Sequence, residues 1–252
     1  MIIHRQPFVI HQFARLGSTN DYLKQLAVTE PEFTCAVAIE QTAGRGRRER
    51  QWHSSAGDGL YLSVLLAPQS ATKLSLLSLM TSIAVAETLI ERGVPGVDIK
   101  WPNDVLVNGR KLCGILVESV SSGSDAPRIV VGVGVNLNHQ SFPEELHSTA
   151  TSLRLETGQT TPVDEFRDQA LGRLLDWYMR WVRGDWRLIL DRWRQLSSYA
   201  RGLQVTIALD GEVIQGETAG VNDDGALLLR LPNGETRTIL SGDVTRLRKA
   251  QA

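Results

Sequence analysis

Cysteine, net charge and long apolar runs are all scarce in this sequence. Its 252 residues include two cysteines, Cys35 and Cys113. Neither lies in a C-x-x-C pair or at zinc-site spacing, which excludes a disulfide framework and a structural zinc site. A formal net charge of -1 excludes a global field that could hold nucleic acid or an anionic membrane. No basic start precedes a long apolar stretch, and Ser, Thr and Glu interrupt the longest apolar helical segment, residues 74–90. We therefore expect a cytoplasmic protein that recognises anions only locally.

The order of apolar and turn-forming residues predicts an α+β chain with two domains. Apolar runs predict strands at 8–16, 34–41, 59–67 and 128–139, and helical spacing predicts helices at 18–28, 73–92, 163–183 and 185–198. Asn108-Gly109 between two apolar runs predicts a tight β-hairpin. From about residue 201, short strands alternate with Asp-Gly and Asn-Gly turns, which is typical of a small β-barrel. We expect one domain over residues 1–200 and a barrel over 201–252.

Residues 44–52 concentrate positive charge in a chain that is otherwise nearly neutral. Four arginines against one glutamate give this segment a local charge of +3. Its glycines allow the backbone to approach a ligand closely, and guanidinium groups match phosphate and carboxylate oxygens. Trp52 offers a face on which a base can stack. The pattern favours an anion that carries an aromatic or apolar body, with a solvated basic loop or an RNA-binding patch as an equal alternative. There is no P-loop, because no Gly-Lys-Ser/Thr follows the glycines.

The segment from Lys100 to Asp104 breaks a strand with a Pro-Asn turn. Such a break can aim side chains into a site: Asn103 could read a nucleotide edge and Asp104 could hold Mg²⁺. The plainer alternative is an ordinary turn with Lys100 exposed. In the hairpin that follows, two-residue alternation predicts Lys111 and Cys113 on one face, with Leu112 and Gly114 on the other.

Two further segments combine small or polar residues with a regular element. In residues 130–138, alternation buries one valine-rich face and lines the other with glycines that end in Asn136 and Asn138. This face leaves room either for a flat ligand or for a close crossing of another element, and both interpretations stay open. Ser18, Thr19 and Asn20 predict a helix cap, which can also serve as a polar ligand site.

Together these segments resemble the successive signatures of one family, the biotin–protein ligases. The matching stretches, from about Ser18 to the C-terminus, are STN, EQTAGRGRRERQW, GLYLSVLL, KWPNDVLVNGRKLCGILVES and VVGVGVNLN. The resemblance implies an α+β catalytic domain like that of class II tRNA synthetases, with a mixed sheet flanked by helices, followed by an SH3-like barrel. It also implies an enzyme that uses ATP and Mg²⁺ to make biotinyl-5′-AMP and passes biotin to a lysine of a biotin carboxyl carrier domain.

The resemblance also implies roles for individual residues. Arg47 and Lys111 would be catalytic. The implied biotin-binding residues are Ser18, Thr19, Asn20, Gln41, Gly44, Arg45, Gly46, Arg47, Lys111 and Gly114. The implied adenylate-binding residues are Arg47, Arg48, Arg50, Trp52, Asn103 and Asn136, with Asp104 as a candidate Mg²⁺ ligand. An arginine and a lysine at this place would offset the repulsion between a carboxylate and the phosphate that it attacks.

Two departures from the family pattern generate expectations of their own. The family usually has Gly where this chain has Glu49, and we expect this carboxylate to point to solvent. Only 17 residues precede Ser18, which is too few for the winged-helix domain of family members that repress transcription, so we expect no sequence-specific DNA binding. A homodimer through exposed edge strands is an open alternative.

Two other functions compete with that of a biotin ligase. A lipoate or octanoate ligase or transferase shares the fold, but a polar pocket end made by Ser18, Thr19, Asn20 and Gln41 suits a ureido ring better than a straight acyl chain. A non-catalytic regulator or RNA-binding module is disfavoured by the near-zero net charge and the acidic barrel sequence.

Overall fold

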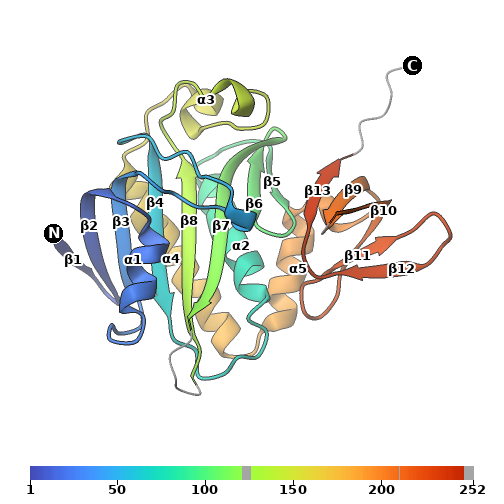
Figure 1. Ribbon diagram of the computed structural model, residues 1–252, viewed down its shortest axis with the longest axis horizontal. Helices are drawn as coiled ribbons and strands as arrows, with labels where there is room; N and C mark the ends of the chain where they lie inside the picture. Colours follow the sequence, from blue (N-terminus) through green and yellow to red (C-terminus); the bar gives the residue numbers. More distant parts are fainter. Residues whose placement is uncertain (121–125, 210, 247–252) are drawn as a thin grey trace.

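The protein forms two β-sheets (Figure 1), described here from a computed structural model that covers residues 1–120, 126–209 and 211–246, without the side chains of Glu49 and Arg246. The larger sheet has the strand order β1-β2-β3-β4-β8-β7-β6-β5. β2 and β3 pair in parallel and the other neighbours pair antiparallel, so the sheet is mixed, as predicted. Its strands are β1 (Ile2–Arg5), β2 (Phe8–Leu16), β3 (Thr34–Gln41), β4 (Gly59–Leu66), β5 (Val97–Lys100), β6 (Asp104–Val107), β7 (Arg110–Val120) and β8 (Arg128–Asn136).

Helices cover the two faces of this sheet unequally. On one face, α2 (Leu76–Glu91) packs against both α4 (Val163–Val182) and α5 (Trp186–Leu196), and the main hydrophobic core lies beneath them. α1 (Thr19–Leu26) lies on the opposite face (Figure 1) over a small apolar cluster around Leu23. The short α3 (Leu153–Thr157) follows β8. In the described part of the chain, each helix is too short or too polar to cross a bilayer.

Local sequence explains the elements that frame the α1 face. Every residue of β4 is buried, since this strand lies mid-sheet beneath α1 on one face and α4 on the other, which accounts for its continuous apolar run. Ser18 has an extended backbone, and its side chain accepts a hydrogen bond from the Asp21 N–H at 3.4 Å. The predicted N-cap is confirmed, and α1 begins directly beside the end of β3.

The C-terminal region forms a separate antiparallel sheet in the order β12-β11-β10-β9-β13. It is fixed to the larger unit at the β5 end: the Trp101 indole N–H donates to the Gly225 carbonyl at 2.9 Å, and Ser198 donates to Asp98 at 2.6 Å. Its strands are β9 (Gln204–Leu209), β10 (Glu212–Val221), β11 (Leu227–Arg230), β12 (Thr236–Ile239) and β13 (Asp243–Arg246).

The hairpin between β6 and β7 turns where predicted, but its side chains do not alternate as predicted. Asn108 and Gly109 have φ values of 50° and 77°, the left-handed pair that a tight hairpin turn requires. The ladder then shifts: Val105 pairs with Cys113 but Leu106 pairs with Lys111, so Leu112 is an extra residue on β7. The bulge reverses the alternation, so the prediction for residues 111–114 is wrong.

Candidate functional site

A cavity of about 640 Å³ opens on the α1 face of the larger sheet. Its floor is the glycine-rich face of β7 and β8, and its roof is the segment 44–52 that the sequence singled out. Residues of β13 and of the connection before β9 close one end. The lining residues that the sequence had predicted are Ser18, Thr19, Asn20, Gln41, Arg45, Gly46, Arg47, Arg50, Trp52, Asn103, Asp104, Lys111, Gly114 and Asn136.

The bulge in β7 is what brings Lys111 into this cavity. A methyl group built on Gly114 would lie 3.2 Å from Lys111 Nζ, which places both residues on the cavity face. Lys111 Nζ lies 2.6 Å from Asp104 Oδ1 and 5.4 Å from the centroid of the Trp52 ring. A single ammonium group therefore meets a carboxylate and an aromatic face inside the cavity.

Glycines of β7 and β8 give direct clearance to side chains that lie on the sheet. A methyl group on Gly134 would meet the Trp52 indole at 2.5 Å, and one on Gly114 would meet the same ring at 2.8 Å. A methyl group on Gly132 would collide with the Asn20 amide. In this structure the glycine face thus holds an indole and an amide, and the indole presents an aromatic surface along the cavity wall.

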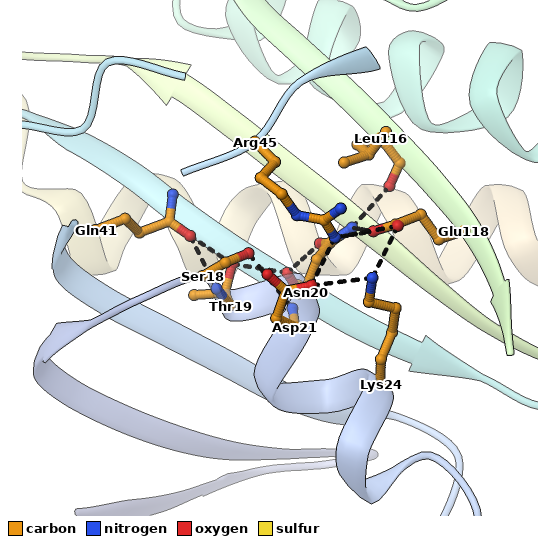
Figure 2. Close-up of polar contacts among 10 residues, drawn as sticks. Ser18, Thr19, Asn20, Asp21, Lys24, Gln41, Arg45, Leu116 and Glu118 are labelled. Carbon is orange, nitrogen blue, oxygen red and sulfur yellow. Dashed lines mark hydrogen bonds and ion pairs between the residues drawn. The ribbon is translucent and has the colours of Figure 1, made fainter. Parts of the chain in front are cut away.

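The cavity end beside α1 is a network of hydroxyls and amides, bordered by the charged side chains of Asp21, Lys24, Arg45 and Glu118 (Figure 2). Gln41 Oε1 accepts from the Thr19 N–H at 2.9 Å and from the Thr19 hydroxyl at 3.1 Å. Gln41 Nε2 donates to Ser54 at 3.1 Å. The Asn20 amide donates to Glu118 at 2.8 Å, which fixes its oxygen on the opposite side, toward Ser63. We call this group the amide end.

With the Thr19 hydroxyl donating to Gln41, the amide end has more acceptors than donors. Ser63 Oγ lies 2.7 Å from Thr19 Oγ1 and 2.6 Å from Asn20 Oδ1. The Thr19 hydroxyl proton is used on Gln41, and a turned Asn20 amide would point its oxygen at the Glu118 carboxylate. Ser63 carries one proton and can serve only one of the two acceptors at a time. An N–H donor from a ligand would satisfy the acceptor oxygen that does not receive the Ser63 proton.

The opposite cavity end is charged. Arg47 Nη1 donates to Asn103 Oδ1 at 3.3 Å, and Asn103 is itself held by donating to the Ile115 carbonyl at 2.7 Å. Lys100, expected to be exposed, lines the cavity and is half-buried. Burial lowers the pKa of both Arg47 and Lys100, and the nearby carboxylate of Asp104 opposes this shift. We call this group, together with Lys111 and Asp104, the cationic end.

Ion pairs hold the arginine segment from both sides. The Arg45 guanidinium donates to Asp21 at 2.6 Å and to Glu118 at 2.9 Å, which ties the segment to α1 and β7 (Figure 2). Arg50 pairs with Asp243 of β13, and Arg48 lies 3.7 Å from the same carboxylate. The segment bridges the two sheets above the cavity.

Several predicted site residues differ from their expected placement. Gly44 and Arg48 are not among the described residues that line the cavity. Gly44 instead closes the base of the segment, where its carbonyl accepts from the Trp52 N–H at 2.9 Å. Asn136 does line the cavity while donating to the Thr151 carbonyl at 3.0 Å. The prediction that Glu49 points to solvent falls on a side chain outside the described residues.

Sequence reasoning missed three residues of the site. Ser63 is the one hydroxymethyl side chain in the apolar run of β4, and a lone serine in a buried strand could have indicated a site residue. Glu118 lies on the same face of β7 as Gly114, at two-residue spacing, so the alternation of the strand could also have identified it. Asp243 had no comparable signal, because its role depends on how the C-terminal sheet packs against the larger unit.

Comparisons with known proteins identify the family of this chain. Residues 12–136 match the biotin/lipoate A/B protein ligase family, and residues 202–246 match the biotin protein ligase C-terminal domain. The bifunctional ligase/repressor BirA of Bacillus subtilis is 35% identical over 91% of this chain and 71% of its own length. The biotin–[acetyl-CoA-carboxylase] ligase of Paracoccus denitrificans is 35% identical over 88% of this chain and 94% of its own.

Solved structures lead to the same family. The biotin protein ligase of Aquifex aeolicus in complex with biotin and ATP superposes with a TM-score of 0.84 at 29% identity, covering 95% of this chain and 99% of that one. The mixed sheet, its helices and the C-terminal antiparallel sheet are therefore the biotin protein ligase fold. The chain belongs to the biotin/lipoate A/B protein ligase family and, within it, to the biotin protein ligases.

Proposed function

We infer that this protein is an ATP-dependent biotin ligase that activates biotin as biotinyl-5′-AMP and transfers it to a lysine of a biotin carboxyl carrier domain. The observation that carries this function is the cavity's division into an amide end short of donors and a cationic end. A ureido ring offers N–H donors to the first, and a carboxylate and a phosphate offer negative charge to the second.

The chemical step explains why cations gather at one end. The biotin carboxylate attacks the α-phosphate of ATP: a bond from its oxygen to the phosphorus forms a mixed anhydride, and the bond from that phosphorus to pyrophosphate breaks, so that pyrophosphate leaves. Two anions must approach, and the fixed charges of Lys111 and Arg47 offset their repulsion in a partly dehydrated site. The Trp52 face packs against the adenylate, and the segment 44–52 keeps water from the mixed anhydride until a lysine amine attacks it.

The same site suits the Mg²⁺ that such a reaction uses. Mg²⁺ is usually held by one or two carboxylates together with substrate phosphates. Asp104 supplies one carboxylate with a side chain that is 16% exposed, inside the cavity and beside Lys111. We propose that Asp104 holds Mg²⁺, which would neutralise phosphate charge there. No cluster of three or more metal-ligating side chains exists among the described residues, in keeping with a metal bound largely through substrate.

The remaining predicted residues divide between contacts to biotin and contacts to the adenylate. Biotin is held by Ser18, Thr19, Asn20, Gln41, Arg45, Gly46, Arg47, Lys111 and Gly114, with Arg45 acting through its backbone because its guanidinium is used on Asp21 and Glu118. Gly44, which does not line the cavity, acts indirectly by closing the base of the segment. The adenylate is held by Arg47, Arg48, Arg50, Trp52, Asn103 and Asn136. Arg48 and Arg50 reach the phosphates by exchanging their carboxylate partner for the nucleotide.

We also propose a larger organisation that the fold supports. The catalytic domain, like that of class II tRNA synthetases, would span residues 1–200 and the SH3-like barrel residues 201–252, of which 121–125, 210 and 247–252 lie outside the described part of the chain. The separate antiparallel sheet over residues 204–246 supports this boundary. A cytoplasmic location stays a prediction, and a homodimer through an edge strand stays an open alternative.

Substrate-dependent pyrophosphate release tests the function directly. The protein is mixed with ATP, Mg²⁺ and either biotin, lipoate or octanoate, and the acyl-adenylate is measured, followed by transfer of labelled biotin to a carrier domain. We expect biotin alone to give adenylate and labelled carrier. Adenylate from lipoate or octanoate, with none from biotin, would contradict the proposal, and no pyrophosphate with any acid would favour a non-catalytic role.

A further inference from the structure

The carboxylate of Glu118 joins the amide end to the arginine segment. Its Oε2 accepts from Asn20 Nδ2 at 2.8 Å and from Arg45 Nη2 at 2.9 Å, while its Oε1 accepts from Lys24 Nζ at 2.9 Å. Figure 2 shows these donors converging on one side chain from α1 and from the segment above the cavity. The Glu118 side chain is 22% exposed, so these bonds form largely out of water.

Glu118 sets the polarity of Asn20. An Asn side chain can present either its oxygen or its nitrogen in a given direction. Here the carboxylate accepts only from the nitrogen, so the Asn20 oxygen stays on the Ser63 side as one of the surplus acceptors. Without the carboxylate, the Leu116 carbonyl, 3.4 Å from Asn20 Nδ2, is the remaining acceptor for this nitrogen. An amide that rotates away from it would point its N–H₂ group toward Ser63, which would cancel the acceptor surplus at the amide end.

Glu118 also anchors the segment above the cavity. Its bonds from Arg45 fix the residue that directly precedes Gly46 and Arg47, both of which line the cavity. The pKa of Glu118 reflects the whole cluster. Burial raises it, but hydrogen bonds from Asn20 and Lys24, with the charge of Arg45, leave it below the ordinary value. The carboxylate is therefore ionised at neutral pH and accepts from all its donors.

We propose that Glu118 is a positioning residue that couples occupation of the amide end to the placement of segment 44–52. The inference rests on the proposed function, since biotin is the ligand that occupies the amide end. A ligand that fixes Asn20 also fixes the Glu118 carboxylate, and through it Arg45. A well-placed Arg45 in turn favours the Asn20 orientation that binds the ligand, so the two events strengthen each other.

Asp21 provides a matched control within the same cluster. It also accepts from Arg45, at 2.6 Å, and pairs with Lys24 at 2.9 Å, but the described contacts of Asp21 do not include the Asn20 side chain. Removing Asp21 loosens the segment from one side only. Removing Glu118 loosens the segment and also leaves the Asn20 nitrogen with the longer bond to the Leu116 carbonyl, at 3.4 Å.

The test measures biotin affinity by calorimetry without ATP, together with the rate of tryptic cleavage within residues 45–50. In the parent, we expect biotin to slow cleavage. In Glu118→Ala, we expect biotin binding to weaken about tenfold or more, as for the loss of hydrogen bonds to a charged group, and biotin no longer to slow cleavage. In Asp21→Ala, cleavage without biotin becomes faster, but affinity stays within about threefold of the parent and biotin still protects.

A second variant separates the contact of Glu118 with Asn20 from its contact with Arg45, even where the alanine variant folds poorly. Glu118→Gln keeps an acceptor for Asn20 but loses the charge that holds Arg45, so biotin affinity should recover most of the loss while protection stays weak. A Glu118→Ala variant that binds biotin like the parent and is still protected overturns the inference alone. A parent that does not bind biotin overturns the proposed function and the inference together.

Discussion

The two ends of the cavity use hydrogen-bonding groups in opposite ways. The amide end is built from hydroxyls and amides whose protons are nearly all committed, with the single proton of Ser63 placed between Thr19 and Asn20. The cationic end is built from ammonium and guanidinium groups with exchangeable carboxylate partners, such as Lys111 with Asp104. The difference suggests that the first end recognises a ligand and the second manages the charge of a reaction. It also makes them separable by experiment.

Removing Lys111 is expected to have the largest effect. Lys111→Ala takes a fixed positive charge from the point where a carboxylate meets a phosphate, and we expect kcat for adenylate formation to fall by about 10²–10³. Arg47→Ala should behave similarly. Biotin affinity without ATP should change less, because the amide end stays intact. The measurement is single-turnover pyrophosphate release.

A control for this result is available on the far side of the molecule. Arg173 on α4 pairs with Glu91 on α2, away from the cavity. Arg173→Ala removes an exposed charge of the same sign and should leave kcat unchanged. A Lys111→Ala enzyme with kcat within threefold of the parent would show that the cationic end does not act on the reacting groups.

The second prediction concerns the amide end. Thr19→Val keeps the side-chain volume but removes one surplus acceptor, so we expect biotin to bind about 10–100-fold more weakly, the cost of a buried hydrogen-bonding group left without its partner. Calorimetry at low and high salt checks this, and the loss should be the same at both because no charge has changed. Thr19→Ser retains the hydroxyl and should bind within a few-fold of the parent. If both variants bind equally well, the proton count does not govern recognition.

The amide end was also the part of the site that sequence could best predict. Ser18, Thr19 and Asn20 are consecutive and start a helix, so capping rules identified them as a helix N-terminus that can bind a polar ligand, and the family resemblance added Gln41. The glycine face of β8 followed equally from two-residue alternation. Local patterns sufficed because each of these features depends on residues that are close in sequence.

The cationic end depended on features that local patterns do not encode. Lys111 reaches the cavity because Leu112 forms a bulge, and nothing in the two-residue period of this strand signals an extra residue. Asp243 meets Arg50 only because the C-terminal sheet packs at the β5 end. The bulge and the packing of two units are long-range outcomes, so the resemblance to a family identified Lys111 where alternation misplaced it.

Lys100 provides a third prediction, in which function and stability change in opposite directions. Its side chain is half-buried, and burial lowers its pKa, so the folded protein binds this proton less readily than the unfolded chain. At neutral pH the charged lysine therefore reduces stability, and that cost diminishes as pH rises through the lowered pKa toward the ordinary lysine value. Lys100→Met should raise Tm by about 2–4 °C at pH 7 and by less near pH 10.

The same variant should weaken nucleotide binding at the cationic end. Lys100→Met removes a cation from the wall, and we expect KM for ATP to rise about three- to tenfold while biotin affinity is unchanged. Thermal unfolding at the two pH values and steady-state kinetics measure both effects. A variant that is less stable at pH 7 would indicate that Lys100 is held by favourable contacts instead of being a charge that the fold tolerates for binding.

Asp243→Asn is expected to have the smallest effect, and it tests whether the carboxylates of the cationic end are exchangeable partners. Asp243 neutralises Arg50 and approaches Arg48 at a partly exposed position, where ion pairs contribute little to stability. If nucleotide phosphates replace this carboxylate, removing it should free both arginines and lower KM for ATP about two- to threefold at low salt, with no difference at about 0.5 M salt, where exposed charges are screened. Asp224→Asn, which removes a carboxylate in the turn between β10 and β11 that pairs with Lys73 instead, should leave KM unchanged. A rise in KM for Asp243→Asn would mean that the carboxylate holds the arginines in their working position, and the cationic end would then be as rigidly organised as the amide end.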